Sequence, residues 1–309
     1  MQARTPYSVA AGALLPAVSC WGMAPVATRY LLTDLTPIQI ILIRFAISTI
    51  LLLPPLLQLR RQRWSRVEIG LAILCGLLNS IGYNLTVAFG LHFIAASLGG
   101  ILIATEPIWI LLLSLLITHE RPHWSIWLGF VVAAIGIGVG TLLGNTRDIS
   151  LTGTQIFGAG LTLLAAFMWS AYTILIRPLT AKYGASSCTA LTTFIGTLPL
   201  FVFYTPQVAT NVLHLNVYGW LALCLLTVGS TVIATMLWNY GVASMPGSQA
   251  GLFLYLVPLI SVIGGALFLH EVITAGVLIS GVLILAGVCI AQARQFMQQR
   301  PAREPLKYT

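Results

Sequence analysis

One stretch of the sequence has residue types and a spacing that could bind a metal. His119, Glu120 and His123 match the pattern H-E-x-x-H. On a continuous helix this spacing places both histidines on one face, where they can bind zinc beside a glutamate base. Pro122 falls inside the stretch, where it would remove a helical hydrogen bond and clash with the preceding turn. We therefore predict no metal site here and keep an intramembrane zinc metalloprotease only as an alternative.

Two charged side chains lie within long apolar runs. Glu106 lies in ILIATEPIWILLLSLLITHE, residues 101–120, and Arg44 lies in an earlier run. A charge at the centre of a bilayer costs about 2.5–3.5 kcal/mol on insertion scales, and such side chains usually face the bundle interior and pair. We predict a buried ion pair between Arg44 and Glu106. A polar anchor for a solute and a proton carrier are the alternative roles of Glu106.

The composition indicates that lipid surrounds much of this chain. Of its 309 residues 58% are hydrophobic and 7% are charged, whereas about 25% are charged in a soluble domain. Ten apolar runs are long enough to cross about 30 Å of hydrocarbon. They are residues 8–30, 37–59, 67–90, 94–118, 124–144, 153–176, 187–205, 217–241, 247–269 and 273–293. The sequence therefore predicts an all-α integral membrane protein with ten transmembrane helices.

The two halves of the chain are similar to each other. An offset of 151 places Pro107 on Pro258. An offset of 148 places Trp21 on Trp169. Each half has five spans, and because five is odd the second half should enter the membrane inverted. Inverted repeats are typical of transporters with a central site between the halves. We predict an N-terminal segment at 1–7, repeats at 8–144 and 153–293, a linker at 145–152 and a tail at 294–309.

Basic residues are distributed unevenly among the segments that join the spans. If the N-terminus is cytoplasmic, twelve of the fifteen Lys and Arg residues fall on the cytoplasmic side, including those of RRQRWSR at 60–66. Arg29 and Arg147 fall on the opposite side, and Arg44 lies within a span. Cytoplasmic loops of membrane proteins are enriched in Lys and Arg. We therefore predict a multi-pass inner-membrane protein with both termini in the cytoplasm.

These features resemble a known family. The ten-span plan with two repeats, the apolar-Pro-apolar fourth and ninth spans ending in His-Glu, and the Gly-rich fifth and tenth spans are similar to EamA-type members of the drug/metabolite transporter superfamily. The resemblance covers roughly residues 8–293. It implies inner-membrane transport of small metabolites, often export, through a cavity built from spans one, three, four, six, eight and nine. Small four-helix relatives carry an essential carboxylate in their first span, and this chain has none there.

Polar and aromatic side chains on the spans implied to line this cavity are candidates for solute contact. Asn79 and Tyr83 share one face of the third span, and Thr231, Thr235 and Asn239 share one face of the eighth. Hydrogen bonding between helices is the competing interpretation. The predicted contact residues are Trp21, Asn79, Tyr83, Glu106, Trp169, Tyr172, Thr235, Trp238, Asn239 and Tyr255.

Pro107 and Pro258 are predicted hinges, because each frees a backbone carbonyl at the same place in its half; static kinks are the alternative. The sequence as a whole predicts a secondary transporter that exports a small organic metabolite, such as an amino acid or an amphipathic compound, by alternating access. It contains no GxxxxGK[ST] motif for ATP, and we expect no catalytic residue, cofactor or nucleic-acid partner. The lipid bilayer is an expected partner. A passive channel or receptor is an alternative, and both a monomer and a homodimer remain open.

Overall fold

The computed structural model describes residues 7–93, 102–142, 153–269, 279, 281–287 and 289–291. These residues form helices, and no strand occurs among them. Predictions on His270, Glu271, the 145–152 linker and both termini lie outside the described residues. The helices are α1 (Tyr7–Leu31), α2 (Pro37–Leu51), α3 (Leu53–Gln58), η1 (Leu59–Arg61), α4 (Arg66–Leu77), η2 (Leu78–Leu85), α5 (Thr86–Phe93), α7 (Glu106–Ile117), α8 (Trp124–Leu142), α9 (Gly153–Leu175), α10 (Arg177–Tyr183), α11 (Ala185–Thr197), η3 (Leu198–Phe203), α12 (Pro206–Leu213), α13 (Val217–Cys224), η4 (Leu225–Ala234), α14 (Thr235–Ser244), α15 (Gly247–Ala250), η5 (Gly251–Tyr255) and α16 (Leu256–Leu269).

Five helical stretches in the described part of the chain are long and apolar enough to cross a membrane. They are Tyr7–Thr28, Arg66–Leu85, Ile156–Tyr183, Ala185–Phe203 and Val217–Ser244, and they coincide with predicted spans one, three, six, seven and eight. Shorter apolar helices lie in the other five predicted spans. The structure thus supports a multi-pass membrane protein, and the full count of ten crossings stays a prediction.

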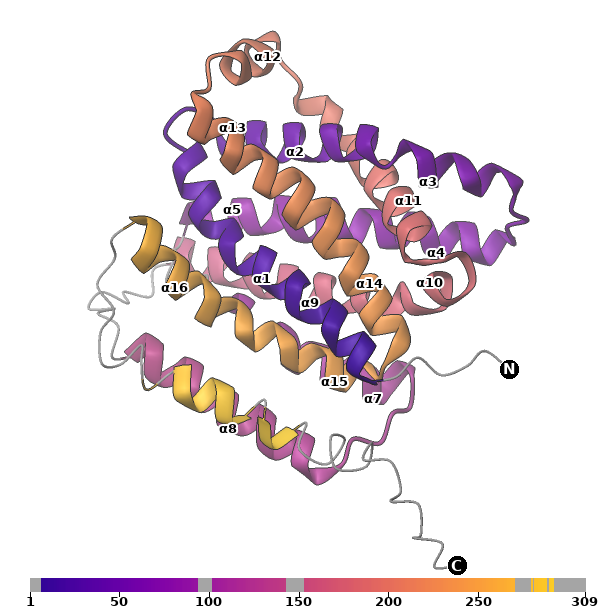
Figure 1. The fold of residues 1–309 in the computed structure, drawn as a ribbon, viewed down its shortest axis with the longest axis vertical. Helices are drawn as coiled ribbons and strands as arrows, with labels where there is room; N and C mark the ends of the chain where they lie inside the picture. Colours follow the sequence, from indigo (N-terminus) through magenta and orange to yellow (C-terminus); the bar gives the residue numbers. More distant parts are fainter. Residues whose placement is uncertain are drawn as a thin grey trace, which may run out of the picture.

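The helices of the two halves pack against each other reciprocally. α1 contacts η4, α14 and α16 of the second half, and α9 contacts η2, α5 and α7 of the first. α2 packs on α11, and α8 packs on residues 284 and 291 of the tenth predicted span. Figure 1 shows α1 and the α13–α14 stretch running side by side across the bundle. Such reciprocal contacts are what two similar halves make around a shared two-fold axis.

Two pairs of residues that match in the repeat also touch each other. The ring centroids of Trp21 and Trp169 are 5.3 Å apart in an edge-to-face arrangement. Between α2 and α11 the hydroxyl oxygens of Thr49 and Thr197 are 2.8 Å apart, and these two residues are again 148 positions apart in the sequence. A residue can contact its own counterpart only where it lies close to the axis that relates the halves. If the two halves are related by such an axis, as the repeat predicts, it passes close to these two pairs.

Two spans depart from regular α-helix at matching places. η2 of the third span and η4 of the eighth are π-helices, in which backbone bonds reach one residue further back. Side-chain hydroxyls follow the same spacing: Thr86 Oγ1 donates to the carbonyl of Ile81, and Thr231 Oγ1 donates to that of Leu226. π-Helical turns are frequent at functional sites. The residues around η2 and η4 are therefore candidates for a functional site.

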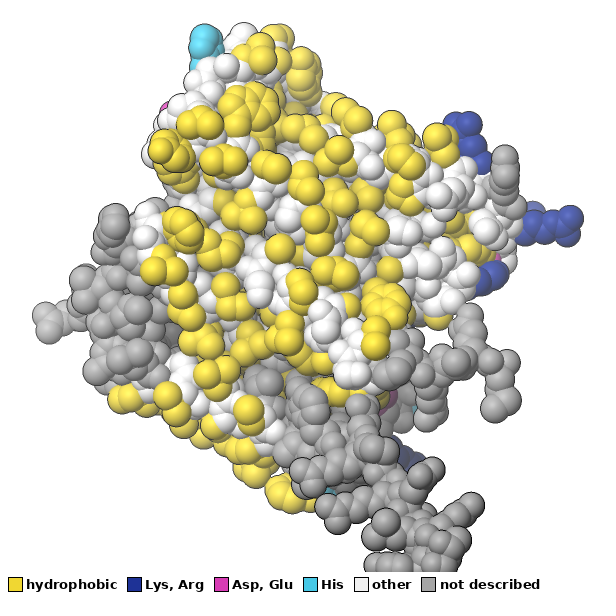
Figure 2. Space-filling model, in the orientation of Figure 1, with side chains coloured by type: hydrophobic (Ala, Val, Ile, Leu, Met, Phe, Trp, Pro, Cys, Tyr) yellow, Lys and Arg dark blue, Asp and Glu magenta, His cyan; other side chains and the backbone are white. Residues whose placement is uncertain are grey.

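The outer surface is mostly apolar. Side chains such as Leu116, Val202 and Leu213 are more than 70% exposed, at 73%, 83% and 76%. In Figure 2 hydrophobic side chains cover the described face of the bundle, and Lys and Arg gather at the edge where α3 gives way to α4. A monomeric soluble protein rarely exposes so large an apolar surface, and lipid is its natural solvent.

Candidate solute-binding site

Five aromatic side chains from both halves meet at the centre of the helix packing. Trp21 lies 5.3 Å from both Trp169 and Trp238, measured between ring centroids. Trp169 lies 5.1 Å from Tyr83 and 5.2 Å from Tyr172. All of these distances fall in the favourable range for aromatic pairs. We call these five residues the aromatic cluster; α1, η2, α9 and α14 supply them.

Hydrogen bonds fix the polar ends of the cluster. Trp21 Nε1 donates to the carbonyl of Ser230 at 3.0 Å, within the π-helix η4. Trp238 Nε1 donates to Thr173 Oγ1 at 3.2 Å. A second set joins Tyr172 Oη to the amide of Asn239, whose Nδ2 lies 2.9 Å from that hydroxyl. Because these groups are already paired inside the protein, they hold the helices together as well as shaping the cluster.

Burial separates the cluster into two kinds of residue. Trp238 and Tyr172 are fully buried at 0% exposed, and Trp169 is 6% exposed. Trp21 and Tyr83 are only partly buried. The first three pack as core, while Trp21 and Tyr83 present surface that a solute could contact in this conformation.

Glu106 is buried beside the cluster with one carboxylate oxygen unsatisfied. It is the first residue of α7 and is 5% exposed. Its backbone carbonyl accepts a hydrogen bond from Ser170 Oγ at 3.0 Å. Ser170 directly follows Trp169 in α9, so this bond holds the backbone of Glu106 beside the aromatic cluster. Its carboxylate interacts with Tyr83, but Oε1 has no hydrogen-bond partner. A buried polar atom left unpaired costs about 1–3 kcal/mol, more when it is charged.

The predicted ion pair between Arg44 and Glu106 is not formed. Arg44 instead donates through Nε to Thr231 and through Nη2 to Ser230 Oγ at 3.3 Å. The ion pairs among the described residues are Arg177 with Glu120 and Lys182 with Glu68. The physical reason is that α2 packs against η4, whose hydroxyls lie nearer to the guanidinium than the carboxylate does. Tyr83 lies within electrostatic reach of both charges.

The other predicted contact residues have different surroundings. Asn79 and Thr235 are 5% and 6% exposed, and the hydroxyl of Thr235 bonds back to the carbonyl of Ser230 at 3.4 Å. Tyr255 is 1% exposed and lies away from the cluster, in a separate apolar group with Phe130 of α8, their ring centroids 5.8 Å apart. The structure therefore brings Asn239 and Thr235 to the cluster's polar edge and places Tyr255 elsewhere.

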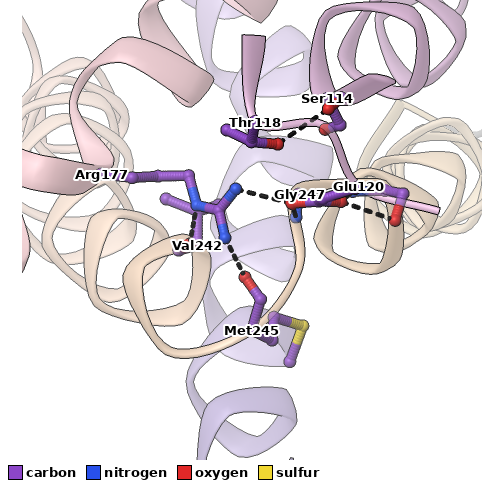
Figure 3. A network of polar contacts seen from close by, with 8 residues as sticks. Ser114, Thr118, Glu120, Arg177, Val242, Met245 and Gly247 are labelled. Carbon is purple, nitrogen blue, oxygen red and sulfur yellow. Dashed lines mark hydrogen bonds and ion pairs between the residues drawn. The ribbon is translucent and has the colours of Figure 1, made fainter. Parts of the chain in front are cut away.

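Glu120 of the H-E-x-x-H stretch has a structural partner. Figure 3 shows its carboxylate facing Arg177 and the start of α15. Arg177 Nη1 donates to it at 2.7 Å, and the backbone N–H groups of Gly247 and Ser248 donate at 2.9 and 3.2 Å. Arg177 also donates to the carbonyl of Met245 at 3.0 Å. These contacts, which we call the Glu120 network, tie together the ends of three predicted spans.

The same geometry disfavours the zinc alternative. The segment from His119 to His123 lies between α7 and α8 and is not helical. His119 has a φ of 52°, a left-handed conformation that commonly ends a helix. The two histidines therefore lack the shared helical face that zinc binding by this motif requires, and the glutamate already accepts four hydrogen bonds.

Burial and hydrogen bonding act in opposite directions on the pKa of Glu120. Burial alone would raise the pKa of its carboxyl group. The donors Gly247 N–H, Arg177 and Ser248 N–H outweigh burial and hold the pKa below its ordinary value. Glu120 is thus held ionised and keeps its attraction for Arg177.

Sequence reasoning missed several partners in this region. Ser170, Thr173 and Thr189 are each fully buried and bond to Glu106, Trp238 and Asn239 respectively. Small hydroxyl residues are common in membrane helices and give no distinctive pattern. Their partners lie on other helices, so these bonds become visible only when the helices are packed.

Comparison with known proteins agrees with this architecture. The model of the EamA-like transporter family matches the chain twice, over residues 9–141 and 156–292. The chain therefore belongs to the EamA-like transporter family. Homologues that the chain matches are named as transporters.

Individual relatives are distant but nearly full-length. An uncharacterized transporter of Archaeoglobus fulgidus is 26% identical over 88% of this chain and 95% of its own. A protein of Streptantibioticus cattleyicolor named a probable terminal-alkyne amino-acid exporter is 26% identical over 96% and 98%. A solved crystal structure at 19% identity superposes with a TM-score of 0.79, covering 96% of this chain and 100% of that one. This last likeness concerns the fold alone.

Proposed function

We propose that the protein is an inner-membrane secondary transporter that exports a small organic metabolite, an amino acid or a similar amphipathic compound, by alternating access. The observation that carries the proposal is the aromatic cluster. It joins both halves at a pair of repeat-matched tryptophans, Trp21 and Trp169, and is flanked by the two π-helices. A site on the axis between two halves can be exposed to either side when the halves rock.

The chemistry of the cluster supports an amphipathic solute. Indole and phenol rings offer apolar area, while Glu106 and Arg44 provide one negative and one positive group nearby. A pocket with mostly apolar walls and a few placed polar groups is typical of small-molecule sites. The relative named as an exporter of an amino acid fits this chemistry.

The Glu120 network supports the proposal that the transporter is closed at its cytoplasmic end in this conformation. In the proposed topology the loop carrying Glu120, the end of α9 at Arg177 and the start of α15 at Gly247 are all cytoplasmic. Their mutual hydrogen bonds hold that end of the bundle together in this structure. Opening toward the cytoplasm requires these contacts to separate, so the network acts as the cytoplasmic gate in this proposal.

Counterflow in proteoliposomes tests the function. Vesicles are loaded with one neutral L-amino acid or aliphatic amine from a panel, and uptake of a radioactive trace of the same compound is measured. A carrier produces transient accumulation of the tracer that saturates with concentration. A passive channel allows equilibration without accumulation, and a receptor gives neither. Absence of saturable counterflow for every member of the panel would overturn the proposal.

A further inference from the structure

The strongest unexplained feature of the molecule is the unsatisfied carboxylate oxygen of Glu106. Its side chain is 95% removed from solvent, and no described residue donates to Oε1. Ser170 holds the backbone carbonyl of this residue through a 3.0 Å hydrogen bond, so the fold fixes the main chain from which the carboxylate projects. A buried carboxylate normally accepts several hydrogen bonds or pairs with a cation, and Oε1 has no such partner among the described residues.

The neighbours of this oxygen suit a positively charged ligand group. Tyr83 interacts with the carboxylate and at the same time packs on Trp169, with ring centroids 5.1 Å apart. Trp21, partly exposed, also packs on Trp169. An ammonium group is attracted both to a carboxylate and to the faces of aromatic rings. The same neighbours offer no second cation to a phosphate or a sulfate.

A complementary charge lies within electrostatic reach of the same Tyr83. Arg44 interacts electrostatically with the phenol and is itself partly exposed. Its Nε and Nη2 bond to the hydroxyls of Thr231 and Ser230. A guanidinium carries five N–H donors, and no described residue accepts from Nη1. Arg44 can therefore receive a carboxylate while it remains anchored to η4.

We propose that this site binds a zwitterionic amino acid, with the ammonium group at Glu106, the carboxylate at Arg44 and the apolar side chain against Trp21. Tyr83 interacts with both charged residues. This inference rests on the proposed function and narrows its solute to compounds that carry both an amine and an acid. In this proposal Arg44 and Glu106 do not pair with each other because each binds the solute group of opposite charge.

Three probes that differ only in their charged groups test the assignment. L-Phenylalanine carries both groups, phenethylamine lacks the carboxylate, and 3-phenylpropionate lacks the amine. Their affinities for the purified full-length protein are measured by titration calorimetry. In Glu106→Gln, L-phenylalanine and phenethylamine should bind at least about tenfold more weakly, as expected for a lost charged hydrogen bond, while 3-phenylpropionate keeps its affinity.

Arg44→Gln should show the converse pattern, weakening L-phenylalanine and 3-phenylpropionate and sparing phenethylamine. This second variant tests the site even if Glu106→Gln does not fold. A uniform loss for all three probes in either variant would assign a structural role and overturn the proposal. So would a wild-type protein that binds none of them.

Counterflow of the same probes separates this inference from the proposed function. Probe binding with the predicted charge pattern but without counterflow would support the site and refute the transporter. Saturable counterflow of another solute, with no effect of either charge on binding, would leave the transporter standing and refute the site.

Discussion

At the scale of single residues, the two matched tryptophans should behave differently. Trp21 is partly exposed, whereas Trp169 is 6% exposed within the cluster. Trp21→Ala should therefore reduce counterflow several-fold at near-normal protein levels. Trp169→Ala should cost about 3–5 kcal/mol of stability, as buried aromatic truncations do, and lower the amount of folded protein as well. Thermal melts in detergent and counterflow per folded molecule measure the two effects.

Trp109 provides a matched control for this prediction. It is partly buried, packs on Phe167 with centroids 5.6 Å apart and bonds to Thr105 Oγ1 at 3.2 Å, outside the aromatic cluster. Trp109→Ala should lower stability without a specific loss of counterflow. Equal counterflow in Trp21→Ala and the wild type would contradict a solute contact at Trp21.

The Glu120 network should make stability depend on pH in a definite direction. The folded pKa of Glu120 lies below its ordinary value, about 4.3 in unfolded chains. The stabilisation is therefore fully present above about pH 4.3 and is lost as the pH falls through the folded pKa. Glu120→Gln should lower the melting temperature at neutral pH, and its difference from the wild type should shrink on acidification below about pH 4.

The Lys182–Glu68 pair serves as the comparison, because it lies on the surface, with side-chain exposures of 55% and 19%. Exposed pairs contribute about 0–1 kcal/mol, so Lys182→Gln should change the melting temperature less than Glu120→Gln does. A difference between Glu120→Gln and the wild type that widens toward acidic pH would refute the assignment of the lowered pKa to this contact.

Sequence could predict some of these contacts and not others, for a physical reason. The repeat aligns Trp21 with Trp169 and so predicted that the two are counterparts, whereas their direct contact is seen only in the packed structure. The sequence did not predict the partners of Arg44, because the hydroxyl groups of Ser230 and Thr231 compete with Glu106 for its guanidinium. The direction in which these hydroxyl groups point depends on a π-helical turn. Periodicity at the ordinary helical spacing gives no sign of such a turn.

At the scale of helices, both predicted hinges lie where regular α-helix restarts. α7 begins at Glu106 with Pro107 in its first turn, after a turn at residues 104–105. α16 begins at Leu256, two residues before Pro258 and directly after the 3-10 helix η5. Proline is well accommodated in a first helical turn. Each proline therefore lies just after an interruption of regular α-helix. The sequence could locate both interruptions because it shows where the prolines are.

Pro107→Ala and Pro258→Ala should each slow counterflow several-fold with little change in melting temperature. Alanine permits the preceding segment and the following helix to join into one continuous helix, which removes a point of bending. Initial counterflow rates and thermal melts measure the effect. Pro206→Ala is the control, because Pro206 opens the peripheral helix α12 in the same manner. Unchanged rates in both hinge variants would leave static kinks as their role.

At the scale of the whole molecule, the two halves interlock so that neither forms a separate core. The largest apolar cluster combines residues of α1 with residues of α9, α14 and η5, such as Leu14, Tyr172 and Trp238. Small residues bring helices of the two halves close: a methyl group on Gly129 would lie 2.5 Å from the carbonyl oxygen of Gly287. The sequence predicted the Gly-rich fifth and tenth spans but not their contact, because pairing between helices depends on tertiary packing.

The proposed orientation of the molecule rests on its basic residues, while the packing agrees with the grouping of the loops on two sides in either orientation. Contacts between loops join segments assigned to the same side: the hydroxyl of Tyr183 donates to the carbonyl of Arg63, and Tyr30 bonds to Asn216 on the opposite side. Twelve of fifteen basic residues fall on the proposed cytoplasmic side, and such loops resist translocation.

A single cysteine at Arg63, introduced after the five native cysteines are replaced, should resist an impermeant thiol reagent in intact cells and react after permeabilisation. A cysteine at Asn216 should react in intact cells. The reverse pattern would invert the topology, place the Glu120 network on the outer side and turn the proposed cytoplasmic gate into an external one.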